Sequence, residues 1–259
     1  FGFIKKVDVL FSRNSYSFIL LLLITYLTQN AYINYESIDW DISSYLVASN
    51  NLSFDNLPYQ NQWESKQPIL YILYKFIIVF SKGNLVLFKL INDLIIFLIS
   101  LMLFNLVKKE LKSNYFSLLI SSLYLVFMST PWGTAEYSEV FSLFFIVLGL
   151  NILSTNKQSF VNLFMVGLIF GISIMINIGS AIVIIGTVFF LERNIINKSI
   201  YLLLGSTVPL ILLTYFYHSR ELSKIFLETT FYIPLNDPSS ATSSPKILIG
   251  PGETILTSL

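Results

Sequence analysis

The sequence predicts an all-α fold, in which a bundle of helices crosses a lipid bilayer. Only 12% of the 259 residues are charged, compared with about 25% in an ordinary soluble domain. Residues of the AVILMFWYC set make up 54% of the chain, and the mean hydropathy is +0.70. Several apolar runs approach the roughly 20 residues that a helix needs to cross a bilayer. These observations exclude a soluble globular domain and a disordered chain.

The composition also excludes several classes of function. The net formal charge is +1, so there is no basic field for nucleic acid and we expect no nucleic-acid partner. The absence of cysteine excludes a disulfide framework and thiolate metal sites. His218 is the only histidine, so we expect neither a histidine metal cluster nor a Ser-His-Asp triad.

The two ends of the sequence indicate a piece of a longer chain. The first residue is Phe1 rather than Met, and the stretch from Gly250 to Leu259 stops without a helix or a cap. We therefore expect one transmembrane domain over residues 1–259, incomplete at the C-terminus and, from the missing Met, at the N-terminus.

The first expected crossing covers residues 15–31 and follows Lys5, Lys6 and Arg13. This positive flank predicts a cytoplasmic N-terminus. No small-residue cleavage site follows the apolar run, which favours an uncleaved anchor over a signal peptide. Residues 28–84 are then expected to form an extracytoplasmic loop region that contains interfacial helices.

Residues 69–80 are apolar but short, and Lys75 interrupts them. If they crossed the bilayer, the lysines that follow the next apolar run would lie outside. The positive-inside rule therefore favours an interfacial helix. The lysines in question are Lys108, Lys109 and Lys112.

Residues 85–217 are expected to hold the remaining transmembrane helices, and residues 218–259 a further extracytoplasmic loop region. The expected crossings are 85–107, 115–129, 140–153, 160–175, 181–191 and 199–217. We expect Asn151 and Asn177, which interrupt this apolar region, to make interhelical hydrogen bonds rather than to bind ligands.

Acids and aromatic residues alternate in the first outer region, which suits sugar stacking or anchoring at the interface. Asp39 and Asp41 flank a tryptophan, and Tyr45 and Tyr59 follow. The alternatives are a solvated acidic loop and, for Asp41, a helix cap. Lys66 has the alternatives of pairing with a nearby acid or snorkelling to headgroups.

The order of residues in this region resembles a known family pattern, an acid after the first span followed by a Glu-x-Lys-Pro-Pro segment and apolar aromatics. The matching residues are Asp41, Tyr45, Ala48, Pro58, Tyr59, Glu64, Lys66, Pro68, Leu70, Tyr71 and Tyr74. The pattern resembles the GT-C class of membrane glycosyltransferases, in the branch of the bacterial aminoarabinose transferases and protein O-mannosyltransferases. Two positions depart from it: Ile42 stands where a second acid is common, and Gln67 replaces the first proline.

A second, weaker match lies in the loop 131–139. Glu139 precedes an apolar run, as an acid of the family often does, and Glu136 is the alternative. The topology argued from charges puts this loop on the same side as Asp41. Glu139 has the further alternative of capping the helix that follows.

The resemblance implies transfer of a sugar from a polyprenyl-phosphate donor at the extracytoplasmic face of the plasma (inner) membrane, with inversion. The acceptor is a lipid, glycan or protein hydroxyl, which must lose a proton to a carboxylate as it attacks. Catalytic roles are expected for Asp41 and Asp39. Substrate-binding roles are expected for Tyr45, Tyr59, Glu64, Lys66 and Glu139.

We expect no metal and no other cofactor, because two neighbouring carboxylates without a further fixed ligand predict a metal site only weakly. The alternatives to a transferase are a lipid or polysaccharide transporter or flippase and a non-catalytic membrane subunit. A transporter should carry polar or broken helices near the midplane. Here the expected crossings are plain and the polar residues gather at one face, which favours chemistry at the surface.

Overall fold

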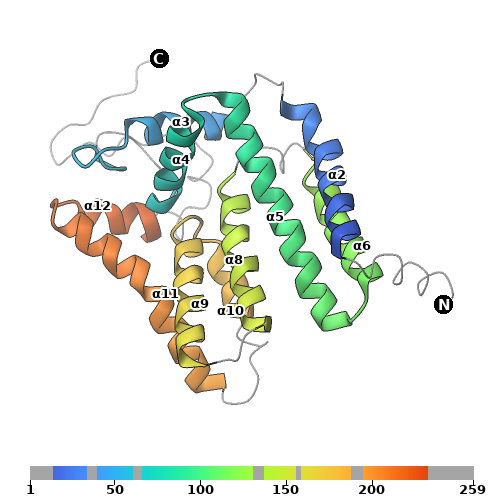
Figure 1. Cartoon of the computed structure of the whole chain (residues 1–259). Helices are drawn as coiled ribbons and strands as arrows, with labels where there is room; N and C mark the ends of the chain where they lie inside the picture. The colour runs from blue at the N-terminus through green and yellow to red at the C-terminus, as the bar shows by residue number, and fades with distance from the viewer. Residues whose placement is uncertain are drawn as a thin grey trace.

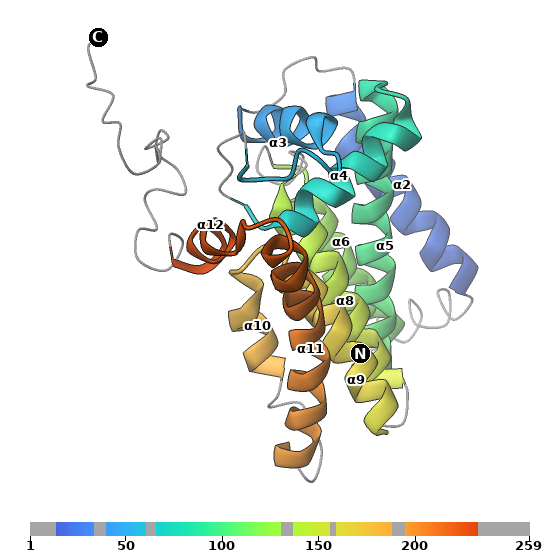
Figure 2. The same ribbon diagram turned by 90° about the vertical axis from the view of Figure 1, so that its left-hand side faces the viewer.

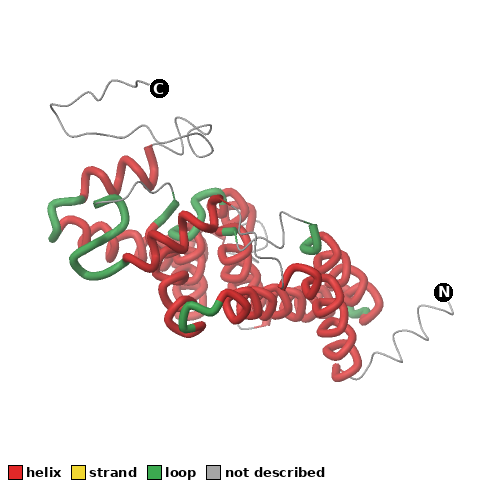
Figure 3. Tube along the Cα trace, turned by 90° about the horizontal axis from the view of Figure 1, so that it is seen from above, coloured by secondary structure: helices red, strands yellow, loops and turns green. Residues whose placement is uncertain are grey.

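The structure is a computed structural model that describes residues 14–33, 40–60, 66–130, 137–155, 159–187 and 195–232. These ranges contain helices and one isolated bridge between Ser53 and Asn56, so the all-α prediction is confirmed (Figure 3). The helices are α2 Asn14–Ile33, α3 Trp40–Asn51, α4 Pro68–Ser81, α5 Leu85–Leu111, α6 Asn114–Phe127, α8 Ser138–Thr155, α9 Phe160–Ile174, α10 Ser180–Thr187, α11 Ile195–His218, α12 Ser223–Leu227 and the π-helix η2 Glu228–Tyr232.

Local sequence explains where several helices begin and end. The side chain of Asn84 accepts a hydrogen bond from the Leu87 N–H at 3.1 Å and caps α5. Ser113 caps α6 in the same way, at 3.4 Å from the Phe116 nitrogen. At the other ends, Lys82 after α4 and Lys112 after α5 adopt left-handed backbone conformations, each with φ of 51°.

The long helices α5, α8, α9 and α11 run roughly along one direction, with α2 and α6 against one side of α5 (Figure 1). One apolar cluster joins α2, α5, α6 and α8 through Leu21, Ile96, Leu125 and Val147. A second cluster joins α9 to α11 around Phe170 and contains buried Leu163 and Leu202. Together, the two clusters form the body of the bundle.

Helices α3 and α4 pack together over one end of this bundle (Figure 2). Ile42 and Tyr45 of α3 are buried with Tyr74 of α4, Phe88 of α5 and Phe141 of α8. The Lys75 ammonium on α4 also donates to the Asn50 carbonyl of α3 at 2.7 Å. Helices α3 and α4 thus form a packed layer, joined in sequence to the non-helical residues 52–60.

Glycines allow α9 and α11 to approach closely. A methyl group on Gly167 would collide with the Leu202 carbonyl, and one on Gly205 with the Phe164 carbonyl. Gly171 likewise faces Ser206 of α11. Small residues at such contacts are typical of packed membrane helices, because packing replaces the hydrophobic effect there.

Two described helices, Leu85–Leu111 and Ile196–His218, are long and apolar enough to cross a membrane by length and composition. The other helices at expected crossings are shorter: α2 has 20 residues, α6 has 14, α8 has 18, α9 has 15 and α10 has 8. The predicted topology, including the interfacial assignment of α4 and the division into one domain with two outer regions, stays a prediction. Residues 233–259 of the last outer region lie outside the described residues.

Candidate functional site

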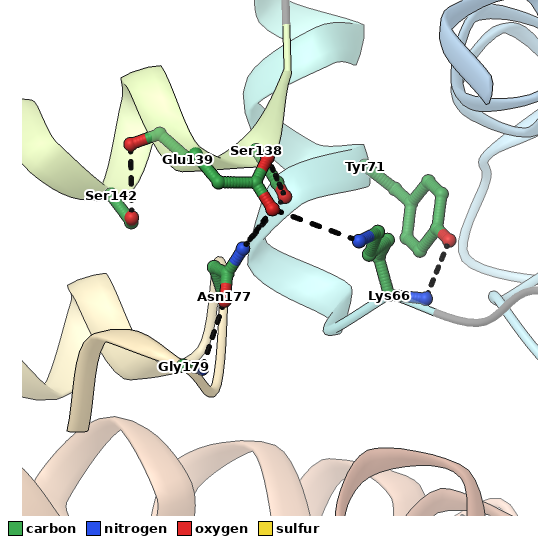
Figure 4. Close-up of polar contacts among 7 residues, drawn as sticks. All are labelled: Lys66, Tyr71, Ser138, Glu139, Ser142, Asn177 and Gly179. Carbon is green, nitrogen blue, oxygen red and sulfur yellow. Dashed lines mark hydrogen bonds and ion pairs between the residues drawn. The ribbon is translucent and has the colours of Figure 1, made fainter. Parts of the chain in front are cut away.

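Lys66 and Glu139, which lie far apart in the sequence, come together at the end of the bundle that α3 and α4 cover. The Lys66 Nζ lies 4.0 Å from the Glu139 Oε1. Lys66 precedes α4, whereas Glu139 is the second residue of α8. We refer to Lys66, Ser138, Glu139 and Asn177 as the Lys66–Glu139 cluster (Figure 4).

Asn177 and Ser138 fix the Glu139 carboxylate. The Asn177 Nδ2 donates to the Glu139 Oε1 at 2.7 Å and lies 3.0 Å from the Ser138 Oγ. The Ser138 hydroxyl donates to the Glu139 Oε2 at 3.1 Å. The Asn177 Oδ1 in turn accepts from the Gly179 N–H at 2.8 Å, which orients the amide (Figure 4).

Hydrogen bonds to main-chain carbonyls join the three segments that carry the cluster. The Ile69 N–H at the start of α4 donates to the Met175 carbonyl at the end of α9, at 3.2 Å. The buried Ser173 hydroxyl of α9 donates to the Ser142 carbonyl of α8 at 2.9 Å. The relative positions of Lys66, Glu139 and Asn177 therefore depend on how α4, α8 and α9 are bonded to one another.

Two tyrosines hold the main chain of Lys66. The Lys66 N–H donates to the Tyr71 hydroxyl at 3.2 Å, and the Tyr59 hydroxyl donates to the Lys66 carbonyl. Tyr59 has a φ of 73°, which is uncommon for a residue with a Cβ. Its ring packs against Tyr217 of α11, whose hydroxyl donates to the Pro58 carbonyl at 3.4 Å. The loop before Lys66 is therefore anchored on α11.

Asp41 lies in the first turn of α3, with an exposed side chain. The helix begins at Trp40, so Asp41 is inside the first turn rather than at the cap position. A carboxylate there interacts favourably with the positive end of the helix dipole. One turn later, Tyr45 packs edge-on against Tyr71 and Tyr74 of α4. This packing places the start of α3 at the same end of the bundle as the Lys66–Glu139 cluster.

The other expected site residues differ in their surroundings. Tyr45 is 3% exposed and Tyr59 is 4% exposed, so both rings are packed against other aromatic rings. Asp39 and Glu64 lie outside the described residues, as does Glu136. The catalytic and substrate-binding roles of all these residues stay predictions.

The sequence pattern did not indicate Asn177 or Tyr71 as site residues. The interhelical bond expected for Asn177 is present, but it reaches the carboxylate of a site residue. Asn151 makes the other expected bond, from its Nδ2 to the Met102 carbonyl of α5 at 3.0 Å. The sequence signal for Asn177 is its position in a short polar turn between two apolar runs.

The cluster remains partly open to solvent. The side chain of Lys66 is 22% exposed and that of Glu139 is 62% exposed. An ion pair with this exposure contributes about 0–1 kcal/mol to stability. The ammonium can therefore turn to an anionic ligand at small cost, while Asn177 and Ser138 retain the carboxylate.

Two other cations at this end have carboxylate partners of their own. The Arg220 Nη1 lies 3.6 Å from the Asp55 Oδ1, and the Lys224 Nζ lies 3.9 Å from the Glu228 Oε1. The described residues contain no group of three or more His, Asp or Glu side chains suited to hold a metal ion. Among these three cations, Lys66 is the one whose carboxylate partner is Glu139.

Comparison with known proteins identifies a family. Residues 12–253 match the model of the Alg9-like mannosyltransferase family, which has a GT-C fold. No curated protein and no solved structure matches the chain. The GT-C class indicated by the motifs is confirmed, although the matching family differs from the branch that the motifs resemble. The chain therefore belongs to the Alg9-like mannosyltransferase family, a family of membrane glycosyltransferases that use lipid-linked sugar donors.

Proposed function

We propose that the protein transfers a mannosyl group from a polyprenyl-phosphate donor to a hydroxyl of a glycan acceptor at the extracytoplasmic face of the membrane. The family supports mannose as the sugar. Lipid and protein hydroxyls are the other acceptors that the sequence motifs imply. In this proposal the protein is a multi-pass protein of the plasma membrane with a cytoplasmic N-terminus.

The contact between Lys66 and Glu139 is the observation that carries the proposal. It joins the two family-like motifs, which come from different parts of the chain, at 4.0 Å. Asp41 lies in the first turn of α3, which packs on α4 through Tyr45. Transfer from a sugar phosphate needs a base for the acceptor and positive charge for the leaving phosphate, and a carboxylate and a cation at this end of the bundle can supply them.

The proposed reaction is a single displacement. The acceptor oxygen attacks the anomeric carbon as its proton passes to the Asp41 carboxylate, or to Asp39 if that residue is the base. The new C–O bond forms on the face opposite to the phosphate, and the bond from the anomeric carbon to the phosphate oxygen breaks. The lipid phosphate leaves with both electrons of that bond, and the configuration is inverted.

The other residues have binding roles in this proposal. Lys66 meets the negative charge that develops on the phosphate, and a preformed contact of this kind stabilises the transition state. Glu139, held by Asn177, accepts hydrogen bonds from hydroxyls of the sugar or the acceptor. Glu64 has a similar expected role, and Tyr45 and Tyr59 support the surface from beneath or contact the sugar at their edges.

The test is a transfer assay with the protein in membranes and a panel of polyprenyl-phosphate sugars, with mannose first. Asp41→Asn and Lys66→Gln should each lower transfer at least a hundredfold at matched protein levels, as expected for a lost base or charge contact. The matched control is Asp55→Asn, because the Asp55 side chain is 95% exposed and paired with Arg220.

The outcomes separate the proposed roles. Full transfer by Asp41→Asn with loss in Asp39→Asn would move the base to Asp39. An equal loss of transfer in Asp55→Asn would mean that the assay responds to the net charge of this surface rather than to the site residues. If wild-type protein consumes no donor in the presence of membrane extracts as acceptors, the transferase proposal is wrong and a transporter or an accessory subunit takes its place.

A further inference from the structure

A groove lies between the first turns of α2 and the last third of α5, away from the Lys66–Glu139 cluster. Its volume is about 540 Å³. It is lined by Ser15, Ser17, Phe18, Ile19, Leu101, Phe104 and Asn105. Because α5 rises about 1.5 Å per residue, Phe104 lies roughly 28 Å along the helix from Leu85. The groove is thus near the opposite end of the bundle.

The wall of the groove suits a hydrocarbon chain. Its lining includes the apolar side chains of Phe18, Ile19, Leu101 and Phe104, of which Phe104 is only 3% exposed. Phe18 and Ile19 are exposed at the rim, so the groove opens on the outside of the bundle. Its volume lies in the range of pockets that hold small ligands. In the predicted topology α5 crosses the membrane, so lipids surround this face of the bundle.

Positive charge follows the groove at the C-terminal end of α5. The Lys108 ammonium lies over the Phe104 ring, 5.5 Å from its centroid, and therefore directly beside the wall. Lys109 is in the same last turn of α5, and Lys112 follows the helix. Basic residues at the ends of membrane helices attract the headgroups of anionic lipids.

We propose that this groove binds an anionic glycerophospholipid. One acyl chain lies along Phe18, Leu101 and Phe104, and the headgroup phosphate contacts the Lys108 ammonium. The lysines predict that this end faces the cytoplasm, where anionic lipids are abundant. The inference does not rest on the proposed transferase activity, because no residue of the Lys66–Glu139 cluster takes part.

The experiment is native mass spectrometry of the purified protein titrated with phosphatidylglycerol or with phosphatidylcholine of the same acyl chains. Wild-type protein should bind phosphatidylglycerol about five-fold or more tightly than phosphatidylcholine. Lys108→Gln should weaken the binding of phosphatidylglycerol more than that of phosphatidylcholine, and so remove most of this preference. Asn105→Trp, which places an indole in the exposed side of the groove, should lower the retention of both lipids.

The matched control is Lys198→Gln near the start of α11, which removes one charge at the same end of the bundle but away from the groove. It should leave the preference intact, and thermal unfolding without added lipid checks that each variant is folded. Equal affinities for the two lipids, an equal effect of Lys198→Gln, or no effect of Asn105→Trp would each overturn the proposal. Displacement of phosphatidylglycerol by equimolar undecaprenyl phosphate would also overturn it and assign the groove to a polyprenyl chain.

Discussion

At the scale of single residues, Lys66 is positioned through its main chain. Its N–H donates to the Tyr71 hydroxyl, and its carbonyl accepts from the Tyr59 hydroxyl. Tyr71 is fully buried among the rings of α3 and α4, so its hydroxyl has little freedom to move. The direction of the Lys66 side chain toward Glu139 therefore depends on tyrosines that do not touch the ammonium.

Tyr71→Phe tests this dependence. The change keeps the ring but removes the acceptor for the Lys66 N–H, and an unpaired amide of this kind costs about 1–3 kcal/mol. We expect the KM for the lipid-linked donor to rise about tenfold with a smaller change in kcat. Steady-state kinetics measure the effect, and Tyr26→Phe on the exposed face of α2 is the control. A loss confined to thermal stability would contradict the positioning role.

At the scale of elements, helix ends rather than helix centres carry the site. Glu139 lies in the first turn of α8, Asn177 follows α9, and Lys66 precedes α4. The departure from the family pattern at Gln67 has a structural partner, because the buried Gln67 amide donates to the Thr230 carbonyl of η2 at 3.4 Å. A proline could not make this contact between the site and the last described helix.

The packing of α9 on α11 makes a prediction at the same scale. Gly205→Ala should lower the free energy of unfolding by roughly 1–3 kcal/mol, because the new methyl group meets the Phe164 carbonyl. Gly186→Ala on α10 is the matched control, since a Cβ there meets no atom within 4 Å. Thermal or chemical unfolding in detergent compares the two. Equal stability of the two variants would mean that α9 and α11 are less closely packed than described.

At the scale of the whole molecule, the described polar clusters gather at one end and a run of lysines stands at the other. The first end carries Lys66, Glu139 and Asp41, and the second carries Lys108 and Lys109. This asymmetry agrees with chemistry at one face of the membrane and with anchoring to anionic lipids at the other. The orientation of the bundle in the membrane stays a prediction from the positive-inside rule.

Cysteine labelling tests the orientation of the bundle in the membrane. Because residues 1–259 contain no native cysteine, a maleimide labels only the introduced thiol. Lys82 and Lys112 bracket α5, are both exposed and share a φ of 51°, so Lys82→Cys and Lys112→Cys form a matched pair. A membrane-impermeant maleimide should label Lys82→Cys in intact cells and Lys112→Cys only after permeabilisation. The reverse pattern would place the Lys66–Glu139 cluster on the cytoplasmic side and contradict the proposed face of transfer.

Several features could be predicted from the sequence because they depend on local properties. Hydropathy over about 20 residues determines that the chain is helical and embedded in a membrane. The order and spacing of residues around Asp41 and Lys66 were sufficient to indicate the GT-C class, which the family match confirms. Hydrogen bonds from Asn151 and Asn177 to other segments were also predictable, since an amide in or between apolar helices needs a partner.

The tertiary structure decided which of these residues meet. The contact of Lys66 with Glu139, the hold of Asn177 on that carboxylate and the burial of Tyr45 and Tyr59 all arise from packing between distant segments. Such contacts cannot be predicted from sequence spacing, because the position of one helix end relative to another depends on how entire helices fit together. The chain by itself thus determined the membrane class and the candidate residues, whereas the fit of its helices determined the candidate site.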